Sequence, residues 1–470
     1  MEIGNWQLEI MKLYFYGGAK TVTGSNYLLE SEPYGNPEKP TRILIDCGLF
    51  QGTHYGEELN YQPFSYDPKT IDAVFITHAH IDHTGRLPKL IKDGFMGKIY
   101  STAPTKDFAE QLLLDSERLL FKEAESKGLP ALYTIEDVNA VMRQWQKLSY
   151  HEKIEIGDFE IVFHDAGHIL GSSFISIVSK TESKKIIFSG DLGNMPAPLV
   201  KDTEPLEKAD YVLIESAYGN RIHENPGKRK DKLEDAIEDT VKNKGTLLIP
   251  TFAMERTQEL LYELNDLVEH GRIPPVPIFV DSPLAIRVTA IYKKYSQDPQ
   301  YMDSEAIALM RKGDAIFDFP RLTLTLTKEQ SKSINDVPPP KVILAGSGMS
   351  QGGRILHHEM RYLPDPNSIL LFVGYQTKGS LGRQIQNGAE KVRIRGEEIP
   401  VKCRVITISG YSAHADQTLL MDWLRPVKNS IKKLFIVQGD EEEMSPFAAK
   451  IRDEMAIDTE IPELGEICEL

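Results

Sequence analysis

The segment Thr77-His78-Ala79-His80-Ile81-Asp82-His83 constrains this chain more than any other part of its sequence. It follows the apolar run 71–76, which is expected to form a strand. Because successive residues of a strand alternate between its faces, His78 and His80 are predicted to point the same way. Imidazole nitrogens and carboxylate oxygens suit zinc and similar divalent ions. One catalytic zinc usually takes three protein ligands, so these four side chains predict two adjacent metal ions.

Further candidate ligands follow downstream. His168 lies in the small-residue segment 165–172 after a strand-like run, and Asp191 ends the apolar run 185–188 between two glycines. Taken alone, each residue is typical of an ordinary turn. Placed after the histidine segment, in this order, they extend the predicted metal site. Asp46, at the end of another apolar run, is a candidate to orient one of the ligand histidines.

The order His78-x-His80-x-Asp82-His83, then His168, then Asp191 resembles the metallo-β-lactamase superfamily. Three further segments, 213–221, 249–259 and 345–354, resemble its β-CASP branch of RNA- and DNA-processing nucleases. The sequence is most similar to bacterial and archaeal ribonucleases related to the nuclease subunit of the eukaryotic pre-mRNA 3′-end cleavage complex. Matching motifs run from about Tyr14 to Glu442, which is nearly the whole chain.

The resemblance implies a set of ligands and catalytic groups. His78, His80, His168 and Asp191 would hold one zinc ion, while Asp82, His83 and a shared Asp191 would hold the second. Asp82 would also orient the attacking water. Glu215 matches the acidic motif A of the family, and His414 matches the motif B histidine that donates a proton to the leaving group. Pairing with Glu215 would fix the orientation of His414 and raise its proton affinity.

The chain departs from the family at motif C, where a histidine normally completes the second zinc site. Gln438 occupies that position, Asp440 replaces the usual glutamate, and no histidine follows His414. An amide oxygen is a weaker zinc ligand than an imidazole nitrogen. We therefore expect one tight zinc site and a second, weaker site with Gln438 as a weak ligand. Mn²⁺ is an alternative ion for this centre.

The resemblance implies an αββα sandwich of the metallo-β-lactamase type, interrupted by an inserted β-CASP domain. The predicted boundaries are 11–215 for the first part of the sandwich, 216–398 for the insertion and 399–470 for its C-terminal part. Within the insertion, short apolar runs alternate with helical segments, which favours a parallel α/β sheet. Domain junctions are preferred binding sites, so a cleft between the two domains is expected to hold the substrate.

The predicted activity is hydrolysis of RNA phosphodiester bonds by metal-activated hydroxide. An endoribonuclease is expected, with 5′-exonuclease activity as an alternative mode. Arg256, Ser347 and Arg354 are candidate phosphate-binding residues. Arg256 can equally form a salt bridge at a helix start, and Ser347 can equally belong to an ordinary turn. Two other functions stay open: a different metallo-hydrolase of the same fold, or a catalytically impaired RNA-binding protein because of Gln438. Glu215, His414 and the insertion favour a nuclease.

The composition of the chain indicates which partners it can bind and in which compartment it is expected. The net charge of −15 is unusual for a nucleic-acid-binding protein, so RNA binding would require a locally basic surface. No apolar run reaches 18 residues, which predicts no membrane span. Three widely spaced cysteines and the absence of a signal pattern favour a reducing, cytoplasmic compartment. Single-stranded RNA is the expected partner, and a homodimer is an open alternative. The sequence does not determine which RNA sequence is cleaved.

Overall fold

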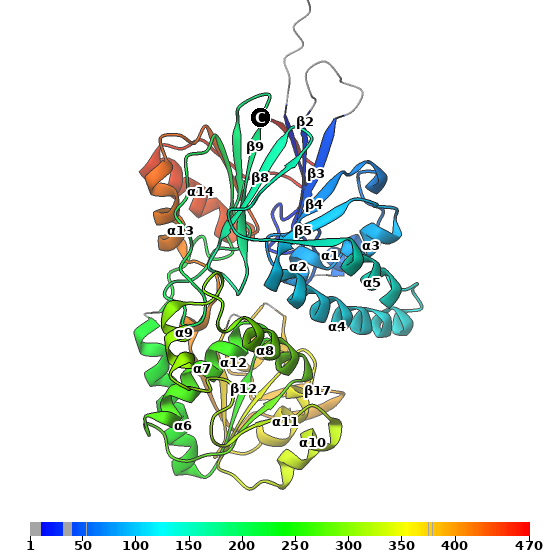
Figure 1. The fold of residues 1–470 in the computed structure, drawn as a ribbon. Helices are drawn as coiled ribbons and strands as arrows, with labels where there is room; N and C mark the ends of the chain where they lie inside the picture. The colour runs from blue at the N-terminus through cyan, green and yellow to red at the C-terminus, as the bar shows by residue number, and fades with distance from the viewer. Residues whose placement is uncertain (1–10, 32–39, 53, 225, 375, 378) are drawn as a thin grey trace, which may run out of the picture. The chain divides into compact units, whose positions relative to one another are not determined.

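The computed structural model describes residues 11–31, 40–52, 54–224, 226–374, 376–377 and 379–470. The chain divides into two compact units (Figure 1). Unit 1 comprises the residues up to Met195, Asp202–Ile222 and His414–Leu470, and unit 2 comprises Pro196–Lys201 and His223–Ala413. Unit 2 is therefore inserted into the chain of unit 1.

In its described residues, unit 1 contains two sheets that pack face to face. The first sheet has the strand order β22 (Ile467–Glu469), β1 (Lys12–Gly17), β2 (Asn26–Ser31), β3 (Thr41–Ile45), β4 (Ala73–Phe75), β5 (Lys98–Thr102) and β6 (Trp145–Leu148). The second has the order β21 (Thr459–Glu460), β20 (Lys433–Val437), β11 (Tyr211–Glu215), β10 (Lys185–Phe188), β9 (Ser173–Ser179), β8 (Phe159–Asp165) and β7 (Lys153–Ile156). Between the sheets, the Phe15 and Phe435 rings lie 5.3 Å apart. Aromatic contacts of this kind form the interior of the sandwich.

Helices cover the outer faces of both sheets in unit 1. The helices beside the first sheet are α2 (Ile81–Thr84), α3 (Leu87–Lys92), α4 (Ala103–Lys127) and α5 (Ile135–Gln144). On the second sheet, α13 (Gln417–Leu424) and α14 (Glu441–Met455) bury their apolar faces against Val212, Ile214 and Leu434 (Figure 1). The predicted αββα sandwich is confirmed.

The direction of the strands places several loops of unit 1 at one edge of each sheet. Strands β3, β4 and β5 are mutually parallel. In the second sheet, β10, β11 and β20 are parallel to one another, and β8 shares their direction because β9 runs antiparallel to both β8 and β10. Side chains that follow these strands therefore gather at common edges of the sheets.

Unit 2 is built on a parallel sheet, as predicted. In the described residues its strands lie in the order β14 (Leu322–Leu324), β13 (Ile278–Asp281), β15 (Lys341–Ala345), β12 (Thr246–Pro250), β16 (Ile369–Phe372) and β19 (Arg404–Thr407). Every pairing between them is parallel. The longer helices of the unit are α6 (Arg229–Asn243), α7 (Arg256–Glu269), α8 (Pro283–Tyr295), α9 (Ser304–Arg311) and α11 (Ile355–Tyr362).

Two local predictions were wrong. The strand before the histidine segment ends at Phe75, so His78 and His80 lie in the loop between β4 and α2 and not on the strand. The helical pattern of residues 134–148 predicts one continuous helix, but α5 ends at Gln144 and the last four residues form β6, which pairs with β5. Trp145, whose side chain is buried, donates a hydrogen bond to Ser101 Oγ across this pairing. Tertiary packing therefore overrides the helical pattern there.

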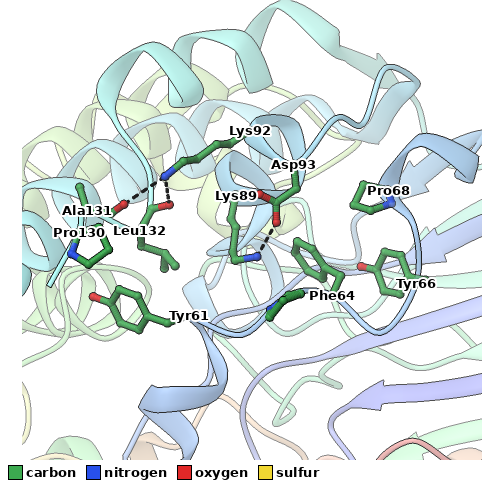
Figure 2. Close-up of a pocket in the computed structure, with 11 residues that line it drawn as sticks. Tyr61, Phe64, Tyr66, Pro68, Lys89, Lys92, Asp93, Pro130, Ala131 and Leu132 are labelled. Carbon is green, nitrogen blue, oxygen red and sulfur yellow. Dashed lines mark hydrogen bonds and ion pairs between the residues drawn. The ribbon is translucent and has the colours of Figure 1, made fainter.

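Unit 1 also has a pocket of about 550 Å³ beside α3 (Figure 2). Tyr61, Phe64 and Tyr66 line it together with two lysines of α3. Lys89 Nζ lies 4.4 Å from the centre of the Phe64 ring and pairs with Asp93, while Lys92 donates to the carbonyl groups of Ala131 and Leu132. None of the predicted site residues lines this pocket. Among the helices of the described residues, none has both the length and the apolar character needed to cross a bilayer.

Candidate metal centre

The loop that carries the histidine segment is held by Asp46, which follows β3. The Asp46 carboxylate accepts hydrogen bonds from the backbone N–H of Thr77 at 2.8 Å and from the Thr77 hydroxyl. The start of the next helix is equally constrained, because a Cβ atom on Gly48 would lie 1.5 Å from the Asp82 carbonyl oxygen. Only glycine permits this approach of the two loops. These contacts explain why the chain leaves β4 early and turns sharply at the histidines.

Four side chains converge at the sheet edges of unit 1. His80 Nδ1 lies 3.0 Å from His78 Nε2 and 3.3 Å from His168 Nε2. Asp191 Oδ2 lies 3.3 Å from His78 Nε2 and 3.6 Å from His168 Nε2. Together these residues form a group whose ligand atoms all lie within 4.8 Å of one another. They are the four residues that the resemblance assigns to one zinc ion.

This geometry suits a tetrahedral metal ion. Bonds of 2.0–2.1 Å to zinc would place neighbouring ligand atoms about 3.3 Å apart. Burial, reinforced by neighbouring histidines, lowers the pKa of His78, His80 and His168 and so favours the neutral, ligating form. Burial opposes ionisation of Asp191, but the charges of His83 and His414 and the hydrogen bond from His78 outweigh it and hold the Asp191 pKa well below its usual value. Three neutral imidazoles and one carboxylate form a donor set that zinc prefers.

His83 occupies a neighbouring position with different partners. Its Nδ1 lies 2.7 Å from Asp46 Oδ2, which confirms the expectation that Asp46 orients a histidine. On the other side of the ring, Nε2 lies 3.3 Å from Asp191 Oδ1. Asp82 is half-buried, and burial together with the nearby Asp191 charge raises its pKa. His83 and Asp191 thus face each other where the resemblance places the second metal ion.

Gln438, which follows β20, reaches into this second position. Gln438 is only 3% exposed, and its backbone N–H donates to the Gly18 carbonyl. The side-chain Nε2 donates to Asp191 Oδ1 at 2.9 Å and lies 3.1 Å from His83 Nε2. A carboxylate oxygen can only accept, so the amide nitrogen of Gln438 is the group that faces Asp191. Gln438 therefore presents N–H groups, not its oxygen, to the residues predicted to bind the second ion.

Glu215 and His414 form a pair beside the four converging ligands. His414 Nδ1 lies 3.2 Å from Glu215 Oε2 and 3.8 Å from Asp191 Oδ2. Glu215 is fully buried at the end of β11 and accepts from the Leu192 N–H. Burial by itself lowers the pKa of His414, but the charges of Glu215 and Asp191 and the bond to Glu215 outweigh it and raise that pKa to about 9. His414 is thus equipped to carry a proton at neutral pH.

Comparison with known proteins agrees with this geometry. Three family models match the chain: the metallo-β-lactamase superfamily over residues 39–206, the β-CASP domain over 257–385, and a Zn-dependent metallo-hydrolase RNA specificity domain over 398–462. Ribonuclease TTHA0252 of Thermus thermophilus is 39% identical over 435 residues, which is 92% of this chain and 94% of the relative. The chain belongs to the β-CASP ribonucleases of the metallo-β-lactamase superfamily.

Other β-CASP relatives extend the comparison. An RNase J-like protein of Methanocaldococcus jannaschii is 30% identical over 462 residues, covering 97% of this chain and 99% of that protein. Transcription termination factor FttA of Methanosarcina mazei is 31% identical over 458 residues, covering 94% of this chain and 69% of its own length. A crystal structure of a protein of unknown function from Enterococcus faecalis shares the fold, with a TM-score of 0.55 at 13% identity over 98% of this chain and 100% of that one.

Unit 2 contains the three predicted phosphate-binding residues, and each of them forms hydrogen bonds or ion pairs with other residues of the chain. Arg256 begins α7, is buried, and pairs with Glu255 and Glu259 at 3.3 Å. Ser347 Oγ accepts from the backbone N–H groups of Gln351 and Gly352, as in a turn. Arg354 donates to Asp281 at 2.7 Å. These contacts match the structural alternatives that the sequence left open for Arg256 and Ser347.

Sequence reasoning missed two features of this β-CASP chain. The first is Thr77, whose contacts with Asp46 hold the histidine loop and which stands in the sequence only as an unremarkable flanking residue. The second is Asp281, which accepts from His358 at 2.8 Å as well as from Arg354. An aspartate directly after an apolar strand was a usable signal for Asp281, because the same pattern identified Asp46 and Asp191.

Proposed function

We propose that this protein is a zinc-dependent endoribonuclease that hydrolyses single-stranded RNA. One observation carries the proposal. Asp191 is one of the four converging ligands, and it also lies beside His414, which pairs with Glu215. Phosphodiester hydrolysis needs an activated water, neutralisation of phosphoryl charge and a proton for the leaving oxygen. A zinc ion held by His78, His80, His168 and Asp191 would supply Lewis acidity for the first two requirements if it took water or a phosphoryl oxygen as an additional ligand.

The residues of the chain would supply the rest. Asp82 would orient the attacking water by accepting a hydrogen bond. His414 would donate the proton to the leaving 3′ or 5′ oxygen, because the carboxylates beside it stabilise its protonated form. Buried Glu215 would hold His414 in place through the two contacts to Nδ1. General acid catalysis of this kind typically contributes a factor of about 10² to 10⁴ in rate.

RNA is proposed as the substrate on the grounds of kinship. The matching C-terminal family model is described by its RNA specificity, it covers residues 398–462, and that range includes both His414 and Gln438. Two of the relatives carry ribonuclease names. Phosphate contacts from Arg256, Ser347 and Arg354 remain part of the proposal. The intact ligand group and proton donor favour an active enzyme over a catalytically impaired RNA-binding protein.

Zinc content and cleavage products would test the proposal together. Purified protein with one equivalent of Zn²⁺ should cut an end-labelled, unstructured RNA internally, and it should leave an RNA duplex and a single-stranded DNA of the same sequence largely intact. Asp191→Asn, which keeps the side-chain shape but removes the charge shared by both proposed sites, should abolish cleavage. Absence of cleavage by the zinc-loaded parent protein, or equal cleavage of the DNA, would reject the proposal.

A further inference from the structure

A second group of metal-competent side chains lies in unit 1, outside the residues proposed for catalysis. It consists of His151, His164 and Glu204, whose ligand atoms all lie within 4.8 Å of one another. We propose that these three residues form an additional site for a divalent transition-metal ion of the Zn²⁺ and Ni²⁺ class. The resemblance to nucleases assigns none of the three, and their spacing in the sequence gave no pattern.

The distances favour a bound cation. His151 Nε2 lies 3.2 Å from Glu204 Oε1, and His164 Nδ1 lies 3.6 Å from Glu204 Oε2. Ligand atoms around a tetrahedral ion with 2.0–2.1 Å bonds are about 3.3 Å apart, so both contacts fit with small adjustments. Two imidazoles and one carboxylate are borderline donors, which suit Zn²⁺, Ni²⁺ and Cu²⁺ better than Mg²⁺ or Ca²⁺.

The backbone brings the three residues together at β8. The N–H of His151 donates to the Phe163 carbonyl at 2.9 Å, and the N–H of Glu204 donates to the Asp165 carbonyl at 3.0 Å. Phe163 and Asp165 are the two neighbours of His164 on this strand. Residues from two other segments are therefore fixed on either side of one strand histidine, and the site needs little reorganisation to bind an ion.

The surroundings of His164 also match those of a metal ligand. Its ring stacks on Phe174 at 4.7 Å, and its Nε2 lies 2.9 Å from Ser176 Oγ. When Nε2 carries the hydrogen of that bond, Nδ1 presents a lone pair toward Glu204. In that tautomer Nδ1 is able to bind a metal ion, and a partner that fixes the other ring nitrogen is typical of ligating histidines.

The site opens to solvent on one side. The His151 side chain is 60% exposed, while those of Glu204 and His164 are 31% and 10% exposed. An ion could therefore enter without unfolding, and the positions not filled by protein would be taken by water. A metal ion at this site would link the turn before β7 and the segment before β11 to strand β8. We accordingly expect metal binding to stabilise unit 1 without changing the catalytic residues.

Trp423 provides a local reporter for the test. Its indole Nε1 donates to the Glu204 carbonyl at 3.0 Å, and its ring lies 5.3 Å from that of Phe174. The whole chain, loaded with zinc at the proposed catalytic centre, would be titrated with Ni²⁺, a paramagnetic ion that quenches nearby indole fluorescence. Calorimetry with Zn²⁺ would give the stoichiometry. We expect one saturable event at this site in addition to binding at the catalytic centre, together with a rise in the thermal unfolding midpoint.

Three variants make the test specific. His151→Ala and Glu204→Gln should each weaken Ni²⁺ binding at least about 10-fold, since removing a partner of a ligand alone costs 10- to 100-fold in affinity. His270→Ala is the matched control, because His270 is 67% exposed beside Asp266 but lacks a second histidine, and its titration should equal that of the parent. RNA cleavage and catalytic zinc content should be unchanged in His151→Ala. Identical titrations for the parent and His151→Ala would overturn the proposal.

Discussion

Nε2 of Gln438 lies 2.9 Å from Oδ1 of Asp191 and donates a hydrogen bond to this carboxylate. The same nitrogen lies 3.1 Å from Nε2 of His83, so one amide group contacts two residues proposed to bind a second metal ion. A cation at that position would have to displace the N–H groups or turn the amide over. The departure from the family at motif C therefore does more than remove a ligand, because it also adds a competing hydrogen-bond donor.

We predict that Gln438→His raises the affinity for a second metal ion at least about 10-fold, because it removes the amide donor and supplies an imidazole ligand. Elemental analysis after dialysis against limiting Zn²⁺ should find about one ion more in the Gln438→His variant than in the parent protein. Activity of the parent should respond to added Mn²⁺ or Zn²⁺.

Gln438→Ala is the control for this prediction, since it removes the amide without adding a ligand. It should bind the second ion more weakly than Gln438→His. If calorimetry in a His151→Ala background, which lacks the additional site, shows two equally tight ions and no gain from Gln438→His, the inference from the Gln438–Asp191 hydrogen bond is wrong.

The group formed by His78, His80, His168 and Asp191 leads to a prediction about His80. His80 Nδ1 contacts the ligand nitrogens of both His78 and His168, and the residue is only half-buried in a loop. His80→Ala should therefore lose tightly bound zinc and RNA cleavage while the protein stays folded, as judged by circular dichroism. His270→Ala, which changes an exposed histidine in unit 2, should keep both properties. Near-parental cleavage by His80→Ala would contradict the proposed metal centre.

The Glu215–His414 pair leads to a prediction about pH. A proton donor is active below its pKa, so activity that depends on His414 should fall as the pH rises through that value. The carboxylates beside His414 raise its pKa to about 9. Glu215→Gln removes one of these charges, and we expect the alkaline limb of the kcat profile to move to lower pH.

His414→Ala completes this test. It should lower kcat by about 100-fold or more, remove the alkaline limb and leave the zinc content unchanged. Loss of zinc from His414→Ala would show that His414 is a metal ligand and not the proton donor.

Much of the fold could be predicted because the signals were local. The apolar runs Thr246–Pro250 and Lys341–Ala345 predict buried strands and the pattern of Arg256–Glu269 predicts a helix, and the structure has β12, β15 and α7 over these residues. Such runs are short, buried and bounded by turn residues. The boundaries proposed for the domains, at 215 and 398, stay a prediction. The helix over 134–148 failed at its end because Trp145 finds a better partner in the neighbouring strand.

The site was predictable where one residue type implies one chemistry. His78, His80, His168 and Asp191 could be read from their order in the sequence, and the structure brings them together. The direction of the Gln438 amide could not be read in this way, because the sequence does not show which end of an amide faces a carboxylate. The His151–His164–Glu204 group was missed for a related reason. It depends on two backbone contacts to β8 between segments distant in the sequence.

The final prediction separates structural and substrate-binding roles for Arg354. This side chain is 20% exposed and donates to Asp281, which is fully buried and also accepts from His358, Thr325 and Ser331. Burial opposes ionisation of Asp281, but these hydrogen bonds outweigh it and lower its pKa below the usual value of about 3.9. The ionised form thus stabilises the folded state above pH 4, and that contribution is lost as the pH falls through the folded-state pKa.

Arg354→Gln should therefore lower the urea midpoint of the protein at pH 7. The corresponding loss in the free energy of unfolding should be about 3 kcal/mol, as for other broken buried pairs. The difference from the parent should persist at pH 3 and shrink only at lower pH, close to the lowered folded-state pKa of Asp281. Arg361→Gln is the matched control, because Arg361 lies exposed on α11, the helix that Arg354 directly precedes, and should not change the midpoint. Urea unfolding at the two pH values and RNA binding by fluorescence anisotropy would be measured for both variants. An unchanged midpoint in Arg354→Gln, combined with weaker RNA binding, would show that Arg354 contacts the phosphates and that its pairing with Asp281 is dispensable for stability.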